Sequence, residues 1–380
     1  MYKKKVMLVF GTRPEAIKMA PIVHLLKTKS EKFDLKVCVT SQHRQMLDQV
    51  LEIFEIKPDI DLNLMKQNQS LSNLTSLILI EMKKIFLNYQ PDIILVHGDT
   101  TTTYATSLAA FYESIPIGHI EAGLRTYNLQ SPFPEEFNRQ ITSKIAKWHF
   151  APTKLSQRNL LSENINASSI IVTGNTVIDA LYWVLAKIDN DVDFKNNLEN
   201  FLNNNLRFDW KKLKFILVTA HRRENFGDGF DQICSAVKDL ALKYSNTHFI
   251  YPVHLNPNVN QSVHQSLSGF SNIHLIDPLK YEVFVYLLKH SYLILTDSGG
   301  IQEEAPSFSK PVLVMRETTE RSEALDAGTV ELVGSNHKKI IKAVSRLLDN
   351  KNHYQEMASS HNPYGDGLAS KRIVDVLQKI

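Results

Sequence analysis

Residues 292–304 read YLILTDSGGIQEE, and this stretch decides the fold class. The apolar run at its start is typical of a buried strand, and Ser298, Gly299 and Gly300 predict a tight turn that leads into a helix. Such a turn directs several backbone N–H groups and the positive end of the helix dipole at one spot, which suits a phosphate or a diphosphate. A plain helix N-terminus, with serine as its cap, has the same pattern, so this stretch alone leaves both interpretations open.

The same succession of strand, turn and helix recurs along the chain. Alternation of this kind predicts an α/β fold, in which helices cover both faces of parallel sheets. A segment rich in Asn, Asp and Lys at 186–212 interrupts the succession, which then restarts. We expect strands at 6–10, 35–40, 93–96 and 115–120 in a first unit, and at 215–219, 248–253, 272–276, 292–296, 311–315 and 330–333 in a second.

The length of the chain also predicts two domains, because 380 residues exceed the size at which a single core stops growing. We place the N-terminal domain at 1–175, the C-terminal domain at 176–361 and a final segment at 362–380. That segment begins with NPYGDG, which is typical of a hinge, and continues as an amphipathic helix. We expect this helix to return to the N-terminal domain.

The composition is that of a globular enzyme, with 43% hydrophobic and 22% charged residues. A net charge of only +3 argues against a nucleic-acid partner. Cys38 and Cys234 form no CxxC motif, and this fits a reduced, cytoplasmic setting. The short apolar run after MYKKK predicts a first strand and not a signal peptide. We expect no membrane contact, because no stretch approaches the roughly 18 apolar residues of a membrane-spanning helix.

Polar clusters follow five of the predicted strands, at 11–18, 97–103, 121–125, 221–225 and 296–304. Because open parallel sheets bind ligands beyond the carboxyl ends of their strands, we expect these clusters to converge on one ligand. Their cations suit a phosphate, since arginine gives bidentate contacts and lysine a point charge. Each cation could instead pair with a nearby glutamate, an alternative that Arg13 and Arg321, beside proline or glycine turns, fit least. The cations are Arg13, Lys18, Arg125, Arg222, Arg223, Arg316 and Arg321.

The clusters also carry acids and a histidine that could move protons, because carboxyl groups in a dry site have raised pKa values. Each has a structural alternative. Asp99 could cap the helix that follows it, the acids after Pro134 could favour a helix dipole, and His221 could be a structural histidine. The members of this set are Asp99, Glu121, Glu135, Glu136 and His221.

Two cofactor classes lack their motifs. His119 and Glu121 form an HxE, but the PCxxC that accompanies it in zinc deaminases is missing, as is HExxH, so no metal is expected. No segment reads GxGxxG, so no nicotinamide cofactor is expected.

Nine segments occur in a distinctive order: GTRPEAIKMAP, HGDTTTT, HIEAGLRT, PFPEEFNR, VTGNTVIDA, TAHRREN, YPVHLNP, TDSGGIQEEAP and RETTERSEA. In order and spacing they closely resemble the bacterial non-hydrolysing UDP-N-acetylglucosamine 2-epimerases, over nearly the whole chain. The resemblance implies a glycosyltransferase B type fold, in which two Rossmann-like domains face a central cleft and the C-terminal domain binds UDP. It also implies a cytoplasmic homodimer that interconverts UDP-GlcNAc and UDP-ManNAc and supplies ManNAc-type sugars for surface polysaccharide.

The resemblance assigns roles to individual residues. Glu304 would hold the ribose hydroxyls, and Phe284 would lie near the uracil. The residues implied to hold the UDP diphosphate are Arg13, Lys18, Ser298, Gly299, Gly300 and Arg321. The residues that match catalytic positions are Asp99, Glu121, Glu135 and His221.

The chemistry of the sugar explains such a set. The C2 hydrogen has no neighbouring carbonyl, so inversion needs either transient oxidation or the loss of a neighbouring group. Without a nicotinamide motif we expect elimination of UDP to 2-acetamidoglucal, followed by re-addition. Paired carboxylates would act as acid and base on opposite faces, while cations and N–H groups stabilise the leaving diphosphate.

Related enzymes give the alternatives. Hydrolysing 2-epimerases, which release free ManNAc, tend to read GTRAD at the first loop, where this chain reads GTRPE. A nucleotide-sugar glycosyltransferase would share the fold but would not need carboxylates around C2. Gln42, Gln45 and His254 match positions at which a second UDP-GlcNAc activates some relatives, whereas Asn68 stands where those relatives tend to carry arginine.

Overall fold

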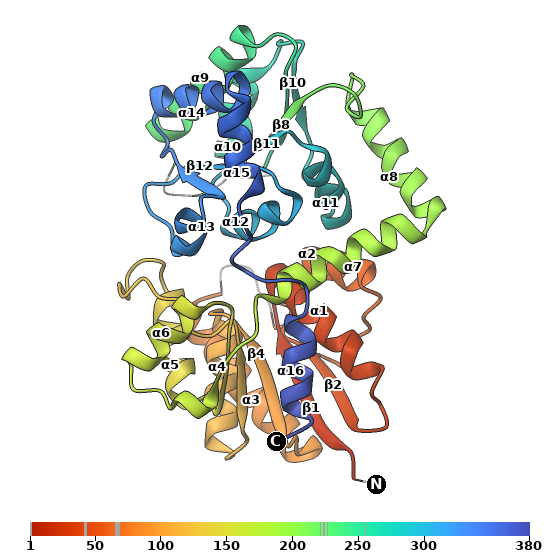
Figure 1. Cartoon of the computed structure of the whole chain (residues 1–380). Coiled ribbons are helices and arrows are strands. Elements are labelled where there is room, and N and C mark those ends of the chain that lie inside the picture. The colour runs from red at the N-terminus through yellow and green to blue at the C-terminus, as the bar shows by residue number, and fades with distance from the viewer. Residues whose placement is uncertain are drawn as a thin grey trace. The chain divides into compact units, whose positions relative to one another are not determined.

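The computed structural model describes residues 2–41, 44–64, 69–220, 222, 225, 227–254 and 256–380, with the side chains of 44, 45, 257 and 258 left aside. His221, Arg223, Gln42 and Asn68 therefore lie outside the described residues. The chain divides into two compact units (Figure 1). Unit 1 comprises Met1–Trp183 and Tyr364–Ile380, and unit 2 comprises Val184–Pro363.

Unit 1 is built on a parallel sheet whose seven described strands run in the order β3-β2-β1-β4-β5-β6-β7. The strands are β1 (Lys4–Phe10), β2 (Phe33–Val39), β3 (Ile60–Asp61), β4 (Ile93–His97), β5 (Ile117–Ile120), β6 (Trp148–Ala151) and β7 (Ile170–Val172). The helices are α1 (Arg13–Lys27), α2 (Arg44–Ile53), α3 (Leu71–Tyr89), α4 (Thr101–Tyr112), α5 (Glu135–Ile145), α6 (Lys154–Ser162), η1 (Ala167–Ser169), the first half of α7 (Thr176–Asn190), and α16 (Ala369–Leu377).

The centre of the unit 1 sheet is buried on both faces, which is why its strands are continuous apolar runs. Met7 and Val9 of β1 pack against α3 and α4. Leu8, between them in the sequence, points to the opposite face and is also fully buried. The sequence analysis did not predict the short strands β3, β6 and β7.

Unit 2 repeats the plan with a parallel sheet whose six described strands run in the order β10-β9-β8-β11-β12-β13. The strands are β8 (Phe215–Thr219), β9 (His248–Pro252), β10 (Ile273–Ile276), β11 (Leu293–Thr296), β12 (Val312–Val314) and β13 (Val330–Leu332). The helices are α8 (Val192–Asn205), α9 (Asp228–Lys243), α10 (Pro257–Leu267), α11 (Tyr281–His290), α12 (Gly299–Glu304), η3 (Ala305–Phe308), α13 (Ser322–Asp326), α14 (His337–Asp349) and α15 (Lys351–Ser359).

Both strand orders reverse direction at one point. In unit 1 the reversal lies between β1 and β4, and in unit 2 it lies between β8 and β11. Ligands of doubly wound sheets bind beyond the carboxyl ends of the strands at such a switch point. The expected α/β class, with two Rossmann-like units, is confirmed.

The chain passes from one unit to the other between residues 183 and 184 and again between 363 and 364. We expected the domain boundaries at 175–176 and 361–362. The first boundary moves because the start of α7 packs on unit 1, where the Trp183 ring stacks on His24 with centroids 5.1 Å apart. The last helix, α16, lies beside α1 in the same unit (Figure 1). Asp179 of α7 accepts hydrogen bonds from the backbone N–H groups of Ala369 at 3.2 Å and Ser370 at 2.7 Å, which hold the start of α16.

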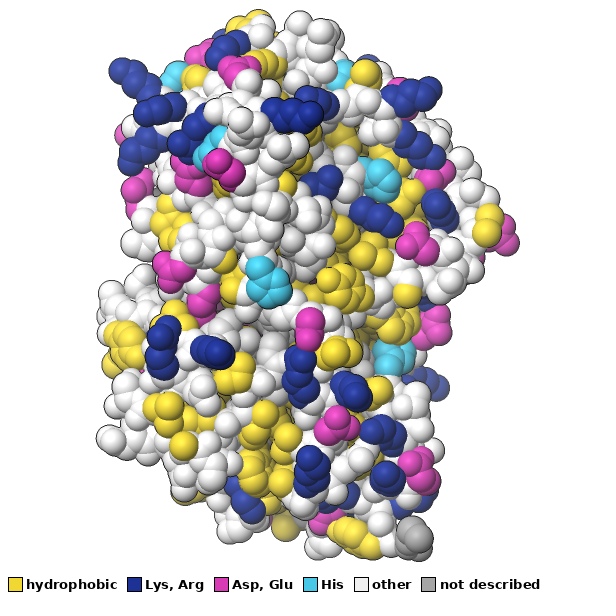
Figure 2. Space-filling view, viewed as in Figure 1, with side chains coloured by type: hydrophobic (Ala, Val, Ile, Leu, Met, Phe, Trp, Pro, Cys, Tyr) yellow, Lys and Arg dark blue, Asp and Glu magenta, His cyan; other side chains and the backbone are white. Residues whose placement is uncertain are grey.

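Charged side chains of both signs are interspersed on the face seen in Figure 2, in agreement with the net charge of +3. Within the described parts of the chain, no helix has both the length and the apolar character needed to cross a membrane.

Candidate active site

In unit 1 the first candidate loop, after β1, is joined to the loop after β4 by a buried carboxylate. One oxygen of Glu15 accepts hydrogen bonds from the backbone N–H groups of Gly11 at 3.0 Å and Thr12 at 2.8 Å, and from the Thr12 hydroxyl at 2.8 Å. The other oxygen accepts from the hydroxyls of Thr100 at 2.7 Å and Thr103 at 3.2 Å. Burial raises the pKa of Glu15, and these hydrogen bonds oppose the rise. Glu15 therefore holds both loops at the switch point.

Sequence analysis missed Glu15 as a site residue, although a signal was present. Thr12 and Glu15 have the spacing of a capping box, which the structure contains at the start of α1. The turn also requires glycine at position 11, because a Cβ there would lie 2.1 Å from Thr40 Oγ1 and 2.5 Å from Thr102 Oγ1. Arg13 is the first residue of α1 and is half-buried.

Glu121, at the end of β5, is the centre of a buried polar cluster. Its Oε2 atom contacts the Lys18 ammonium of α1 and accepts a hydrogen bond from Asn175 Nδ2 at 2.8 Å. His97 Nε2, at the end of β4, lies 3.8 Å from the same oxygen. The side chains of Lys18 and Glu121 are each only 8% exposed. Glu121 also has a positive φ of 62°, a left-handed conformation that is uncommon outside glycine.

The two histidines of this region are neutral near pH 7. Burial lowers the pKa of His97 to about 4, although the charge of Glu121 opposes the change. Burial also lowers the pKa of His119 to about 3. The neutral His119 ring donates through Nε2 to the carbonyl oxygen of Gly98, since the two atoms are 2.7 Å apart and a carbonyl only accepts. His119 thus supports the turn before Asp99, and the described residues contain no metal-binding group of three or more.

Asp99 follows β4 and faces α5. Arg139 Nη2 donates to its Oδ2 at 2.6 Å, and Asn138 Nδ2 donates to its backbone oxygen at 2.8 Å. Burial raises the pKa of Asp99; Arg139 opposes this, while the nearby carboxylates of Glu121 and Glu135 add to it. The side chain of Asp99 is 27% exposed, so it is not closed off in the interior of unit 1.

The alternative role of Asp99 as a helix cap is wrong. Thr100 caps α4, accepting a hydrogen bond from the Thr103 N–H at 3.1 Å. The Asp99 side chain is therefore not engaged by the helix that follows it.

The two adjacent acids of α5 have different surroundings. Glu136 is fully buried and accepts hydrogen bonds from Gln140 at 2.8 Å and from the N–H groups of Thr126 and Tyr127 at 3.0 and 3.1 Å. Burial raises its pKa, but the hydrogen bonds outweigh burial and the pKa lies below its usual range. Glu136 thus holds the segment after β5, whereas Glu135, half-buried at the helix start, acts electrostatically on Asp99.

Arg125 pairs with a nearby glutamate, which is the structural alternative to binding a phosphate. Its Nε and Nη2 atoms donate to the two carboxylate oxygens of Glu163 at 2.6 and 3.1 Å, and Nη2 also donates to Ser143. Its side chain has no exposed surface, so this cation is part of the unit 1 interior.

In unit 2, the stretch after β11 forms the expected turn and helix, although α12 has only six residues. Ser298 occupies the cap position, but its side chain makes no capping hydrogen bond. A Cβ on Gly299 would lie 2.6 Å from Arg321 Nη1 and 2.8 Å from its Cζ, so the guanidinium lies directly against this glycine. A Cβ on Gly300 would meet no atom of the described residues within 4 Å, so none of them covers this side of the turn.

Two glutamates hold the Arg321 guanidinium in place over the turn. Arg321 Nε donates to Glu303 at 2.8 Å, and Nη1 contacts Glu320. Glu320 also accepts from Arg316 at 3.2 Å. Burial raises the pKa of Glu320, but the two arginines outweigh burial and hold the pKa well below its usual range. Arg321 thus pairs with glutamates, as the structural alternative proposed for these cations. These ion pairs orient its guanidinium next to Gly299.

The remaining unit 2 candidates lie near the same strand ends. Glu304 is buried and accepts a hydrogen bond from the Tyr281 hydroxyl at 2.7 Å. Phe284 lies on the same helix as Tyr281, one turn later, and is half-buried. Asp297 Oδ2 accepts from the Arg222 N–H at 2.8 Å, which connects the loop after β8 to the end of β11.

A family model described as UDP-N-acetylglucosamine 2-epimerase matches residues 26–378. The chain belongs to this epimerase family. A Yersinia pestis protein with that name is 57% identical, with 98% of each chain covered, and the Escherichia coli K12 protein is 56% identical with the same coverage. Among solved structures, the Neisseria meningitidis UDP-GlcNAc 2-epimerase bound to UDP-GlcNAc has a TM-score of 0.93 and 54% identity, covering 99% of this chain and 100% of its own.

More distant epimerases keep the same fold. The Methanocaldococcus jannaschii UDP-GlcNAc 2-epimerase, in complex with UDP-GlcNAc and UDP, has a TM-score of 0.84 at 33% identity, with 99% and 100% of the chains covered. Acinetobacter baumannii MurG, at 13% identity and a TM-score of 0.61, shares the fold alone.

The residues that match the activating site of some epimerases are only partly described. Gln42 lies outside the described residues, and Gln45 falls in α2 without a described side chain. His254 is exposed after β9, where its Nδ1 accepts from the Asn256 N–H at 3.1 Å.

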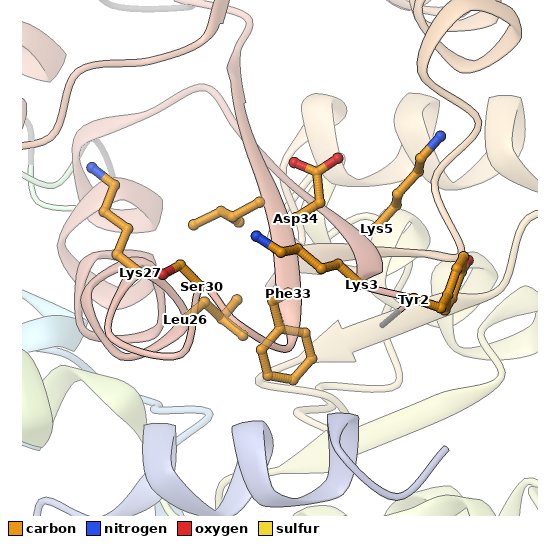
Figure 3. A pocket seen from close by; sticks show the side chains of 9 residues that line it. Tyr2, Lys3, Lys5, Leu26, Lys27, Ser30, Phe33 and Asp34 are labelled. Atoms are coloured by element: carbon orange, nitrogen blue, oxygen red, sulfur yellow. The ribbon is translucent and has the colours of Figure 1, made fainter.

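A surface pocket at the opposite edge of the unit 1 sheet contains none of the candidate residues (Figure 3). It lies at the amino ends of β1 and β2 and the end of α1. Its lining residues are Tyr2, Lys3, Lys5, Leu26, Lys27, Ser30, Phe33, Asp34 and Leu35.

Proposed function

We propose that this member of the family is a non-hydrolysing enzyme that interconverts UDP-GlcNAc and UDP-ManNAc by eliminating and re-adding UDP. The observation that carries the proposal is the carboxylate cluster of unit 1. Glu121 is in contact with Lys18, and burial raises the pKa of Asp99 beside it. Two carboxyl groups in different electrostatic surroundings are what an acid and a base need in order to exchange roles.

The reaction would run as follows. One group removes the C2 proton while the C1–O bond breaks and UDP takes the bonding electrons, which leaves 2-acetamidoglucal. Another group then protonates C2 on the opposite face, and a UDP oxygen re-forms the C1 bond. Atoms and electrons balance without a cofactor, because each step is the reverse of the other at the opposite face.

We further propose the following roles. Arginine, lysine and backbone N–H groups would stabilise the charge of the leaving diphosphate. Support comes from the guanidinium of Arg321, which lies against Gly299 and is held there by Glu303 and Glu320. The diphosphate residues would be Arg13, Lys18, Ser298, Gly299, Gly300 and Arg321; Glu304 would bind ribose, Phe284 would lie near uracil, and the catalytic groups would be Asp99, Glu121, Glu135 and His221.

The test is incubation of UDP-GlcNAc with the protein in D2O. The proposal expects UDP-ManNAc to form, with deuterium at C2 of both sugars by NMR and mass spectrometry. Epimerisation without deuterium uptake would rule out the elimination route. Release of free ManNAc would identify a hydrolysing enzyme, and transfer to an acceptor without C2 exchange would identify a transferase.

We also propose that the enzyme is a cytoplasmic homodimer that supplies ManNAc-type sugars for surface polysaccharide, and that a second UDP-GlcNAc could bind near Gln42, Gln45 and His254. Exposed apolar side chains on the neighbouring helices α3 and α4 support the dimer. They are Ile80, Leu87, Phe111 and Tyr112, which are 53 to 68% exposed. Light scattering should give twice the chain mass for the wild type and a lower mass for Phe111→Asp.

A further inference from the structure

Asn175 lies between β7 and α7 in unit 1 and is almost fully buried, with 3% of its surface exposed. Its side-chain amide donates through Nδ2 to Glu121 Oε2 at 2.8 Å. The residue belongs to the VTGNTVIDA segment, which carries no assigned role in the reaction. We propose that Asn175 is a positioning residue that orients the Glu121 carboxylate for proton exchange at C2. This inference rests on the proposed role of Glu121.

The orientation of the Asn175 amide is determined by a second hydrogen bond. Its Oδ1 accepts from the backbone N–H of Val177 at 3.0 Å, and a backbone N–H can only donate. A flipped amide would set its NH2 group against that N–H and its oxygen against the carboxylate, with the loss of both hydrogen bonds. Asn175 must therefore present a donor to Glu121.

The backbone of Asn175 is also held firmly. Its N–H donates to the carbonyl oxygen of Tyr364 at 2.7 Å, so the segment that precedes α16 lies directly on this turn. Gly174 and Gly365 have positive φ angles of 88° and 136°, which favour glycine at both positions of this contact. The donor of Asn175 is thus placed by the tertiary structure of unit 1, and not by a flexible side chain.

The groups that face the Glu121 carboxylate give this donor its effect. Lys18 contacts the same Oε2 from α1, His97 is 3.8 Å away and neutral, and Asp99 lies near enough for the two carboxylates to repel each other. Two donors on one oxygen favour the ionised form of Glu121 and fix the plane of its carboxylate. Of these two donors the Asn175 amide is the more directional, because the Lys18 ammonium has no preferred direction.

Asn175→Asp and Asn175→Ala separate this role from a structural one. The aspartate keeps an acceptor for the Val177 N–H and replaces the donor with a second carboxyl group, whereas alanine removes both hydrogen bonds. We expect kcat to fall about tenfold or more in Asn175→Ala, with a KM for UDP-GlcNAc that changes less than kcat. If Asn175 only stabilised its turn, Asn175→Asp would have wild-type kcat at every pH.

The pH dependence of Asn175→Asp provides a signature of positioning. At low pH the introduced carboxyl group shares a proton with Glu121 and can still donate to it. As the pH rises, that proton is lost and the two carboxylates repel each other, so kcat relative to the wild type should fall steadily. A ratio that does not change with pH would refute the proposal.

Asn166→Ala is the matched control. Asn166 Oδ1 accepts from the Ser168 N–H at 3.0 Å, the same local hydrogen bond as in Asn175, but Asn166 is the exposed N-cap residue before η1. This variant should retain wild-type kcat and pH profile. Thermal unfolding of all three variants checks that each is folded.

A second readout does not depend on turnover. The Glu121 carboxyl carbon, labelled with 13C and assigned by its disappearance in Glu121→Gln, should titrate at higher pH in Asn175→Ala than in the wild type. An unchanged titration would overturn the inference even if the epimerase reaction is established. A shifted titration in a protein that forms no UDP-ManNAc would retain the contact and reject the proposed function.

Discussion

Replacing Gly299 with alanine should weaken UDP binding without introducing any charge change. The new Cβ would lie 2.6 Å from Arg321 Nη1 and 2.8 Å from Cζ, so the guanidinium must move by roughly 1 Å to reach an ordinary contact distance. Arg321 cannot move that far and keep both its 2.8 Å hydrogen bond to Glu303 and its contact with Glu320. The substitution therefore displaces the cation that we propose for the diphosphate.

The size of the effect follows from the hydrogen bonds at stake. A hydrogen bond to a charged group contributes about 1.5–3 kcal/mol, so the loss of the Arg321 contact should raise the Kd for UDP by about 10- to 150-fold. Titration calorimetry with UDP measures this directly. Arg321→Lys, which keeps the charge but not the planar fork, should lose part of the same affinity.

Gly300→Ala gives the informative comparison. The Cβ at this position would meet no described atom within 4 Å, and alanine is favoured over glycine in a helix by about 0.5–1 kcal/mol, so the chain without UDP should not be destabilised. If UDP occupies the open side of the turn, Gly300→Ala should still weaken UDP binding, since the methyl group would meet the ligand. Wild-type UDP affinity in both glycine variants would refute the assignment of this turn to the diphosphate.

Further predictions concern unit 1. Asp99→Asn should abolish C2 deuterium exchange while UDP affinity stays within about threefold in calorimetry, because the amide cannot transfer a proton; a large loss of UDP affinity would make Asp99 a binding residue. Glu15→Ala should lower the free energy of unfolding by about 3 kcal/mol or more in urea, because two backbone N–H groups lose their acceptor, and a wild-type value would contradict the bridging role. The pKa of His97 is about 4 in the folded chain and about 6.5 in the unfolded chain. The free energy of unfolding should therefore fall by about 3 kcal/mol as the pH falls from about 6.5 to 4, and His97→Gln should lose less stability over the same pH range.

Much of the site followed from the order of motifs along the chain. Polar clusters directly after apolar runs predicted loops at the carboxyl ends of strands, and the structure brings those of β1, β4 and β5 together in unit 1. Strands of a parallel sheet end at the same edge, so this prediction needed only the strand type and no knowledge of strand order. The short strands β6 and β7 escaped prediction, and β6, which reads WHFA, is not a continuous apolar run.

Sequence reasoning could not decide which charged residues serve the ligand and which serve the fold. Arg125 and Arg321 both follow strand ends and both pair with glutamate, yet Arg125 is closed into the interior by Glu163 while Arg321 lies against a glycine turn. Likewise Glu136 holds backbone N–H groups, while its neighbour Glu135 acts on Asp99. Such partners are distant in sequence, and only side-chain directions in the folded unit separate them.

The sequence by itself determined the α/β class and the glycine turn at 298–300, because strand period, turn chemistry and helix caps depend on residues close together in the chain. Tertiary structure alone decided that Arg321 lies over Gly299, that Glu15 joins two loops, and that Asn175 directs a donor at Glu121. The residues of each contact come from different strand ends. Their meeting depends on strand order and on the switch point where that order reverses, which no local pattern encodes.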